Sequence, residues 1–500
     1  MRRLALALGL SFASGFVALS YEILWFRVYS FATAGRAWAF GIMLGAYLLG
    51  IAAGSAAARS SCEGADGEGP ALRVFASVVL ASNVLAYFMI PLYALFVGAS
   101  GGGEAFPLIV LVVPLLGVAF PLLCHFAVPG DERAGARVSY LYLANILGSA
   151  AGSLGTGFVL ADVWSLPRMA TFIALVGLAV SAGAVWLARP QRRQLAALLA
   201  ATAVGAGVTL AATPALFDLV YERLQTKTLH PEPFAQIVEN RSGVITVTSN
   251  GTVFGGGVYD GAFNTSPADE RNQIIRAYGI ALLHPAPKRV LMIGLSSGSW
   301  AQVIAQHPAL EQLTIVEINP GYLDLIPKYP MVASLQHNPK VHIIIDDGRR
   351  WLVRHEDRFD VIVANATFHW RSHATALLST EWLELIRRHL NPGGLYYFNP
   401  TGSLPAVWTA ATAFPYANFI GNSVVVSDSP IEFDQPRAEK LLAEYRLDGQ
   451  LVVDPSLPSY REVLDKYIRK ARPMSSRKAL LSMTEEPQII TDDNMLSEWE

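Results

Sequence analysis

The residues best placed to do chemistry are two glycines and one acid. An apolar run, VLMIGLSSG, starts at Val290 and ends in a turn bounded by Gly294 and Gly298. The next apolar run ends at Glu317. Glycines let a backbone come close to a ligand, and a carboxylate at the end of the following strand can accept hydrogen bonds from ribose hydroxyls. The order predicts a nucleoside site at one edge of a sheet.

The elements around this turn are predicted to alternate between strand and helix. Strands are expected over 289–294, 312–317, 341–345, 359–364 and 395–399. Helices are expected over 299–307, 321–326, 348–354 and 379–389. This alternation is typical of a doubly wound parallel sheet, in which the carboxyl ends of the strands meet at one edge.

A smaller sheet is predicted ahead of the alternating region. Residues 234–265 alternate in polarity and are rich in Val, Thr and Gly, with turn signals at Ser242-Gly243 and Asn250-Gly251. That pattern favours a small antiparallel sheet. A helix near 268–283 is expected to follow, and Asn391-Pro392-Gly393-Gly394 is expected to form a turn.

The N-terminal part of the chain has a different composition. Hydrophobic residues make up 52% of the sequence and charged residues only 16%, and the apolar excess lies in roughly the first 215 residues. Seven segments are long enough to cross a bilayer, near 4–29, 37–58, 74–98, 105–127, 139–161, 169–188 and 194–213. The first is too long for a cleavable signal peptide and is followed by further spans. We therefore expect a multi-pass protein of the cell (inner) membrane.

The arginines predict an orientation that raises a conflict. If the N-terminus is inside, the inner loops hold Arg2, Arg3, Arg59, Arg73, Arg133, Arg137, Arg189, Arg192 and Arg193, and the outer side holds Arg27, Arg36 and Arg168. This is a positive-inside bias. Seven spans would then place the C-terminal part outside, whereas an adenosyl ligand is cytosolic. The conflict disappears if 194–213 does not cross or one span is re-entrant.

Charge and cysteine content exclude other classes. The net charge of −2 gives no basic character that would point to nucleic acid. The two cysteines, Cys62 and Cys124, have no metal-ligand spacing and predict no disulfide framework. No metal site is expected.

From about residue 230 to 450 the sequence resembles the spermidine synthases (polyamine aminopropyltransferases). The N-terminal half resembles the membrane-integral spermidine synthase-like proteins, including their Tyr-Glu-x-x-Trp-x-Arg at Tyr21 to Arg27. The resemblance implies a multi-span helical membrane domain followed by a Rossmann-like domain of the class I methyltransferase type. The expected divisions are a membrane domain over 1–216, a connector and small β-subdomain over 217–288, and a nucleoside-binding domain over 289–500.

The same resemblance implies a nucleoside pocket for S-adenosylmethionine or its decarboxylated form. Gln236 matches the glutamine that touches the adenosine, and Glu317 matches the acid that binds the ribose. Asp346 and Asp347 match the turn whose second acid accepts from the adenine amino group. Asp347 also fits a helix N-cap, and one residue can do both. Gly294, Ser297 and Gly298 form the glycine loop.

The amine-handling positions depart from the family pattern. Ser297 stands where the family has the aspartate that binds the aminopropyl ammonium. Asn365 and Phe368 replace the two aspartates of the catalytic loop. Gln273 lies in Asn-Gln-Ile, where the family has Tyr-His-Glu. Binding a polycation requires carboxylates, and deprotonating an ammonium requires a base, so these changes disfavour ordinary polyamine synthesis.

The residues that replace the family's acids are suited to other chemistry. His369 has the properties of a general base near neutral pH, and Arg371 can pair with a carboxylate. Ser297 would admit the carboxylate of intact S-adenosylmethionine. Tyr259 and Asp260 offer a further substrate contact, or only a turn. Alternatively, the loop at 365–373 has no catalytic role and is only packed by its aromatic residues.

Three functions remain open at this point. The first is a membrane-tethered transferase that moves an aminopropyl, aminocarboxypropyl or methyl group to a small-molecule amine or a membrane-associated acceptor. The second is a spermidine synthase with a diverged catalytic loop. The third is a non-catalytic nucleoside sensor or scaffold on a transporter-like helical bundle. Expected partners are the lipid bilayer and the acceptor, with a homodimer possible.

Overall fold

The computed structural model describes residues 2–63, 68–102, 109–188, 192–269, 271–365, 368–471 and 473–499. The chain divides into two compact units. The helical unit comprises Met1–Ala34, Ala39–Pro233 and Glu239–Gly243. The sheet unit comprises Gly35–Trp38, Phe234–Val238 and Val244–Glu500.

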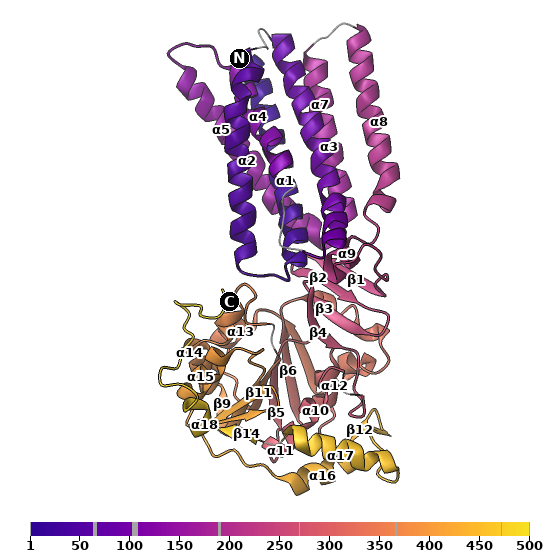
Figure 1. Ribbon diagram of the computed structural model, residues 1–500, viewed down its shortest axis with the longest axis vertical. Helices are drawn as coiled ribbons and strands as arrows, with labels where there is room; N and C mark the ends of the chain where they lie inside the picture. Colours follow the sequence, from indigo (N-terminus) through magenta and orange to yellow (C-terminus); the bar gives the residue numbers. More distant parts are fainter. Residues whose placement is uncertain are drawn as a thin grey trace. The chain divides into compact units, whose positions relative to one another are not determined.

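Long apolar helices make up most of the helical unit (Figure 1). Its elements are α1 (Arg2–Ala32), α2 (Trp38–Glu63), α3 (Glu68–Ser100), α4 (Ile109–Ala127), α5 (Ala134–Leu154), α6 (Ala161–Val163), α7 (Leu166–Leu187), α8 (Arg192–Leu216) and α9 (Val220–Thr226). A π-helical turn over Gly155–Leu160 joins α5 to α6. In the described part of the chain, seven helical stretches are long and apolar enough to cross a membrane.

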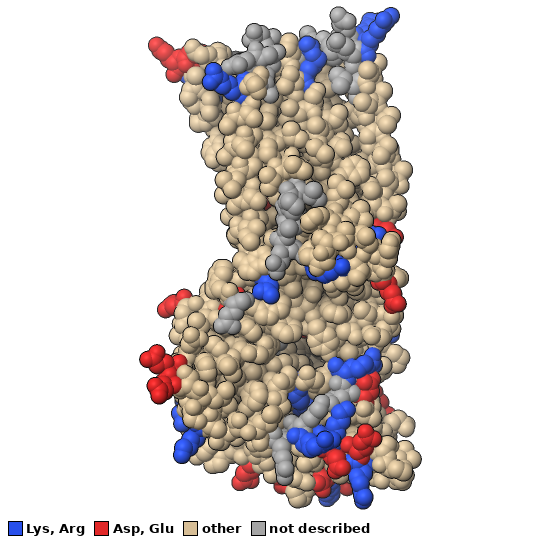
Figure 2. All heavy atoms as spheres, in the orientation of Figure 1, with Lys and Arg blue, Asp and Glu red and all other residues tan. Residues whose placement is uncertain are grey.

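The outer surface of the helical unit fits such a setting. In Figure 2 most of the visible flank of this unit is tan, and coloured atoms gather at the end that holds the N-terminus. Large side chains such as Leu49, Leu111 and Trp186 are more than half exposed. An apolar flank of this kind is suited to contact with lipid, and the membrane location stays a prediction.

Small residues let α1 and α5 approach closely. A Cβ built on Gly148 would lie 1.9 Å from the carbonyl oxygen of Phe12. A Cβ on Gly152 would lie 2.3 Å from that of Phe16. Backbone contact of this kind excludes any larger residue, which is the usual role of small residues four apart in membrane helices.

Side chains of the Tyr-Glu-x-x-Trp-x-Arg motif are buried within the helical unit, where they pack α1 against neighbouring elements. Tyr21 and Trp25 are fully buried, and the Tyr21 hydroxyl donates to Asn83 Oδ1 of α3 at 3.0 Å. Arg27 Nη2 lies 3.6 Å from Glu239 Oε2, and both side chains are about one-tenth exposed. The motif therefore contributes packing and a mostly buried ion pair.

The small antiparallel sheet forms where the sequence predicts it. Its strands, in the spatial order β1-β2-β3-β4, are β1 (Gln236–Asn240), β2 (Gly243–Val247), β3 (Thr252–Gly255) and β4 (Val258–Ala262). The main chain between β2 and β3 turns at Gly251, whose φ is +81°. Both predicted turns therefore lie between strands.

The large sheet has the order β14-β10-β11-β9-β8-β5-β6-β7. Its strands are β5 (Arg289–Ile293), β6 (Gln312–Glu317), β7 (Val341–Ile345), β8 (Phe359–Ala364), β9 (Leu390–Phe398), β10 (Tyr416–Ile420), β11 (Ser423–Ser427) and β14 (Pro473–Ser476). Strands β7, β6, β5, β8 and β9 are parallel, whereas β11 and β10 run antiparallel to their neighbours. The predicted Rossmann-like fold is confirmed for this part of the chain.

Helices cover both faces of the large sheet. They are α10 (Ile275–Tyr278), α11 (Ile280–Leu283), α12 (Ser299–Ala305), α13 (Gly348–Arg354), α14 (Thr380–Arg388), α15 (Leu404–Ala413), α16 (Gln435–Glu444), α17 (Pro458–Ala471) and α18 (Arg477–Leu481). A two-stranded ribbon is formed by β12 (Arg446–Leu447) and β13 (Gln450–Leu451). Two hydrophobic clusters, one on each face, hold the layers together.

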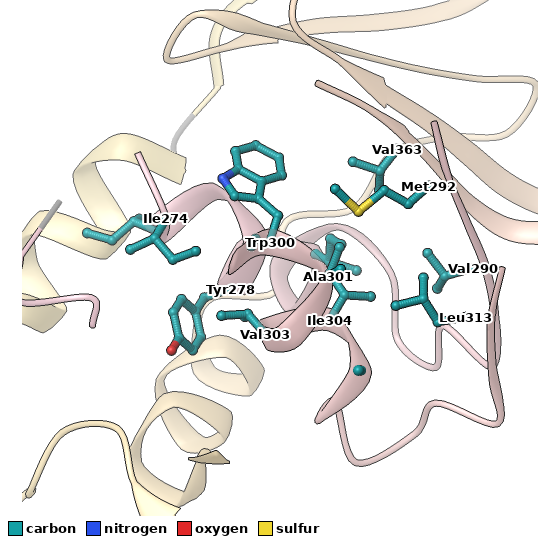
Figure 3. Packing of buried hydrophobic residues seen from close by; sticks show 14 of the residues in the cluster. Ile274, Tyr278, Val290, Met292, Trp300, Ala301, Val303, Ile304, Leu313 and Val363 are labelled. Carbon is teal, nitrogen blue, oxygen red and sulfur yellow. The ribbon is translucent and has the colours of Figure 1, made fainter. Parts of the chain in front are cut away.

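The core beside the binding edge is built around α12. Figure 3 shows Trp300 and Ile304 of this helix near Met292 of β5, with Ile274 and Tyr278 on the other side of the helix. All five are buried. Tight packing at this point fixes the start of α12 and therefore the glycine turn that precedes it.

Three predicted elements differ from the structure. The helix expected over 268–283 is shorter and is split into α10 and α11. The helix expected over 321–326 is replaced by 3-10 turns at Pro320–Tyr322 and Ile326–Lys328, each of which begins close to a proline. The turn expected at 391–394 lies inside β9, where the register shifts against β8 and Gly393 has φ +78°.

Candidate functional site

The predicted turn lies at the carboxyl end of β5, the central strand of the parallel part of the sheet. Gly294 and Gly298 have φ of +88° and +73°, values that favour glycine. A Cβ on Gly298 would lie 3.2 Å from side-chain atoms of Ile326 and Leu335, whereas nothing lies within 4 Å of one on Gly294. Gly298 is therefore required for packing and conformation, and Gly294 for conformation alone.

Glu317 ends β6 and holds this turn. Its Oε2 accepts from the Leu295 N–H at 2.6 Å, and its Oε1 accepts from the Asn319 N–H at 2.7 Å. The side chain is 4% exposed. Burial raises the pKa of Glu317 to about 7, although the two amides oppose that shift. The carboxylate is preorganised beside the turn, where an acid can meet ribose hydroxyls.

A polar cavity of about 240 Å³ opens beside the turn. Described residues from several parts of the sheet unit line it: β4, the start of α10 and the residues before it, the end of β5 with the turn that follows, α12, the loops after β8 and β9, and the turn between β10 and β11. Its lining residues are Tyr259, Asp260, Gly261, Asn272, Gln273, Arg276, Met292, Gly294, Leu295, Ser296, Ser297, Trp300, Asn365, Phe368, Asn399, Thr401, Gly402 and Asn422. Ligands of open α/β sheets bind at such an edge.

The serines of the turn attach it to the small sheet. Ser297 Oγ and Ser299 Oγ both donate to the carbonyl oxygen of Ala262, at 2.9 and 2.8 Å. The Ser296 hydroxyl donates to the carbonyl of Asp260. Ser297 is buried and lines the cavity. The hydroxyl at the position of the family's acid therefore ties β4 to the glycine loop and carries no charge into the cavity.

Asp260 is the carboxylate among the described lining residues. The Tyr322 hydroxyl donates to its Oδ2. Burial raises the pKa of Asp260, whereas Tyr322, Arg371 and Ser296 oppose that shift. Burial lowers the pKa of Arg371, and the nearby Asp260 opposes this. The two side chains stabilise each other's charge, Asp260 at the cavity wall and Arg371 outside the described lining.

The loop after β8 is fixed by the loop after β9. Asn399 Nδ2 donates to Asn365 Oδ1 at 3.3 Å. The His369 N–H donates to Thr401 Oγ1 at 2.9 Å, and the His369 Nδ1 lies 3.1 Å from the Thr401 carbonyl oxygen. The Phe368 and Trp370 rings stack at 5.4 Å. The described residues of this loop are thus held in place, and Asn365 and Phe368 line the cavity.

Two further segments hold the same loop. The Ser372 N–H donates to the Gly35 carbonyl oxygen at 2.9 Å, and the guanidinium carbon of Arg36 lies 5.0 Å from the centroid of the Trp370 ring. From the other end of the chain, Glu498 accepts from the His373 N–H at 2.8 Å. Neither attachment was predicted from the sequence, because both are made by segments far away in the chain.

Some of the predicted site residues meet at the cavity and others do not. Those that line it are Tyr259, Asp260, Gln273, Gly294, Ser297 and Asn365. Those outside its described lining are Gln236, Gly298, Glu317, Asp346, Asp347, His369 and Arg371. Glu317 supports the lining loop from behind, and Arg371 supports Asp260. The site roles themselves remain predictions.

The adenosine-side residues have other contacts in the structure. Lys328 Nζ donates to Gln236 Oε1 at 2.8 Å. The Asp346 N–H donates to the Glu317 carbonyl oxygen at 3.0 Å, so this turn adjoins the end of β6. Asp347 Oδ1 accepts from the Arg350 N–H at 2.7 Å and is the N-cap of α13. The predicted N-cap role is confirmed, and adenine contact stays a prediction.

Arg276 is a lining residue that the sequence analysis missed. It is 7% exposed and lies on α10 within a run of apolar residues. A lone arginine inside an apolar helix was the available signal, since a buried charge needs a partner or a function. Among the described residues, there is no cluster of three or more His, Cys, Asp or Glu side chains placed to hold a metal ion.

Part of the chain is similar in sequence to known proteins. Residues 278–401 match the family model for the spermine/spermidine synthase domain. Polyamine aminopropyltransferase 1 of Pseudomonas aeruginosa is 33% identical over 142 residues, which cover 27% of this chain and 48% of the relative. The polyamine aminopropyltransferase of Mycobacterium tuberculosis is 28% identical over 330 residues, which cover 62% of this chain and 61% of the relative. The chain thus spans about half to three-fifths of these relatives.

A solved spermidine synthase from Thermotoga maritima has 17% identity and a TM-score of 0.35, and the match covers 47% of this chain and 88% of that one. The sequence matches support the spermidine synthase family for the C-terminal part of the chain. That family uses decarboxylated S-adenosylmethionine as a substrate.

Proposed function

We propose that this chain is a membrane-integral transferase that binds an S-adenosylmethionine-type ligand, decarboxylated or intact. It would transfer an aminopropyl or related group to an amine acceptor. The observation that carries the proposal is the glycine turn at the end of β5, with the Glu317 carboxylate fixed behind it and the polar cavity in front. The match of residues 278–401 to the spermine/spermidine synthase domain supports it.

The reaction needs little covalent chemistry from the protein. The acceptor nitrogen attacks the methylene carbon bound to the sulfonium, a C–N bond forms, and the C–S bond breaks. The bonding pair stays on sulfur, which leaves methylthioadenosine when the transferred group is aminopropyl. The acceptor must also lose a proton. Asn365 cannot accept it, whereas Asp260 lines the cavity and is the carboxyl group suited to this role.

The proposal includes a membrane location for the helical unit. Seven apolar helices and the charge-poor flank support it. The chain would be a multi-pass protein of the inner membrane.

Binding of adenosyl ligands by the purified full chain in detergent tests the proposal. Titrations would use S-adenosylmethionine, its decarboxylated form and methylthioadenosine, followed by an assay for methylthioadenosine release with a panel of amines. We expect binding, with turnover for at least one amine. Glu317→Gln should weaken binding, and Glu311→Gln, an exposed acid just before β6, should not. Absence of binding by all three ligands would contradict the proposal.

The alternative of a non-catalytic sensor or scaffold has less support. It is motivated by the replacement of the catalytic-loop aspartates at Asn365 and Phe368. The named relatives are aminopropyltransferases, and the comparisons do not favour the alternative. Tight ligand binding without turnover for any amine would be the result that revives it.

A further inference from the structure

Among its described lining residues the polar cavity carries one cation, Arg276. Arg276 Nη1 donates to Ser423 Oγ on β11 at 2.9 Å. The guanidinium carbon lies 5.5 Å from the centroid of the Trp300 ring. The hydroxyl and the ring restrict the plane of the guanidinium at the cavity wall, and the side chain is 93% buried. A guanidinium held in this way is preorganised for a planar partner.

The other charged side chain of the described lining is offset by its own neighbours. Asp260 accepts from the Tyr322 hydroxyl and lies in the field of Arg371. The remaining polar lining is neutral and is made of amides and hydroxyls, among them Asn365 and Asn399. The cavity therefore lacks the excess of negative charge that a polycation needs on leaving water.

We infer that Arg276 forms a carboxylate subsite, so that the molecule entering this cavity carries a carboxylate group. Arginine pairs with carboxylates through two parallel charge-assisted hydrogen bonds, which are stronger inside a cavity than in water. The same positive charge repels an ammonium group in its place. The neutral amide side chains around it can accept hydrogen bonds from a nearby amino group. The subsite is thus suited to the carboxylate end of an amino acid.

This inference rests on the proposed function, which offers two sources for the carboxylate. One is the methionine part of intact S-adenosylmethionine, and Ser297 removes the acid that would repel it. The other is an acceptor that is itself an amino acid. In both cases Arg276 orients the substrate by its carboxylate and takes no part in bond making.

Two matched pairs of ligands distinguish these sources. S-adenosylmethionine and its decarboxylated form differ by one carboxylate, as do ornithine and putrescine. Each would be titrated into the full chain in detergent by calorimetry, the second pair both with and without saturating methylthioadenosine. We expect the carboxylate-bearing member of at least one pair to bind about tenfold or more tightly.

Variants then connect that preference to the residue. Arg276→Gln should reduce the preference to about twofold or less and leave the affinity for methylthioadenosine unchanged. Arg276→Lys should keep part of the preference, because the positive charge stays while the paired donors of the planar guanidinium are lost. Arg387→Gln is the matched control, since Arg387 is exposed and pairs with Asp428 away from the cavity. If Arg276→Gln does not fold, the ratios of affinity within the two ligand pairs, measured for the wild-type chain and for Arg276→Lys, still test the subsite.

Equal affinity within both pairs for the wild-type chain would overturn the subsite. A preference that survives in Arg276→Gln would also overturn it. Failure of the proposed function has a different signature, because methylthioadenosine would then not bind while ornithine is still preferred over putrescine. A preference in the first pair alone assigns the carboxylate to the donor, and one in the second pair alone assigns it to the acceptor.

Discussion

At the residue scale, Glu317 links the sheet to the binding loop. Both of its oxygens accept main-chain hydrogen bonds, from Leu295 and Asn319. Each carboxylate oxygen has a second lone pair, so the group can hold the loop and still accept from a ligand. Its pKa near 7 makes this acceptor sensitive to ordinary changes of pH.

The affinity for methylthioadenosine should therefore depend on pH. Below about pH 7 the Glu317 carboxyl takes up a proton and becomes a weaker acceptor, so binding should weaken as the pH falls from about 8 to about 6. Glu317→Gln should weaken binding by about tenfold to a hundredfold, because a hydrogen bond to a charged group is worth about 1.5–3 kcal/mol. It should also flatten the pH profile. Calorimetry across this range is the measurement, and an unchanged profile in the variant would contradict the role.

Asn365 offers a second change at the same scale. Asn399 Nδ2 donates to its oxygen, and an aspartate oxygen could accept the same hydrogen bond. Asn365→Asp should therefore fold normally and add a negative charge to the cavity. We expect putrescine to bind about tenfold more tightly, because an acid within the cavity offsets ammonium desolvation. Titration of putrescine into both chains checks this, and Asn418→Asp, on β10 and not among the lining residues, is the control.

At the element scale, the loop after β8 is positioned by distant segments rather than by its own sequence. Glu498 is 3% exposed, and its two oxygens accept from the His373 N–H and from Thr375 Oγ1, at 2.8 and 2.6 Å. Nearby, Asp492 accepts from Arg349 and Ser379. The C-terminal segment thus contacts the loop at His373 and Thr375, the first turn of α13 at Arg349, and the N-cap of α14 at Ser379.

Removal of the Glu498 carboxylate should loosen that loop. Glu498→Ala leaves the partly buried His373 N–H and the buried Thr375 hydroxyl without their acceptor, which should cost about 1–3 kcal/mol of stability. The loop should also become more sensitive to limited proteolysis. Thermal unfolding and digestion of the full chain would measure both, with the exposed Glu485→Ala as the control. Equal behaviour of the two variants would show that the segment packs on the loop without holding it.

At the scale of the whole molecule, the number of membrane crossings sets where chemistry can occur. An odd number of crossings places the two ends of a chain on opposite faces of a membrane. The described part of the chain contains seven suitable helices. Glycine contacts between α1 and α5, and the pair of Arg27 with Glu239, hold the helical unit together.

The proposed transferase needs a cytoplasmic C-terminal end, and the positive-inside bias places the N-terminus inside. We therefore expect reporters fused to both ends of this chain to be found on the cytoplasmic side of the inner membrane. A pair of compartment-sensitive reporters would measure this. Both ends on one side would mean that one helix, such as α8, does not cross. A C-terminal reporter on the outer side would separate the cavity from cytosolic adenosyl ligands and would favour the sensor alternative. A cytoplasmic one would agree with the transferase.

Much of the fold could be predicted because its signals are local. Buried parallel strands are short continuous apolar runs, so β6, β7 and β8 were predicted with the observed bounds. The helix expected over 268–283 became two short helices because tertiary packing around Trp300 overrides the periodic pattern. The C-terminal strand β14 and its neighbours were missed, since they complete the sheet only through partners distant in the chain.

By itself, the sequence determined the helical unit, the doubly wound sheet and the glycine turn that ends in reach of Glu317. These depend on residue order and hydrophobic period, which act over a few residues. Only the tertiary structure decided which side chains face one cavity. It brought Arg276 to the wall, placed His369 and Arg371 outside the described lining, and anchored the loop through Glu498. Those facts depend on contacts between segments far apart in the chain, which no local pattern records.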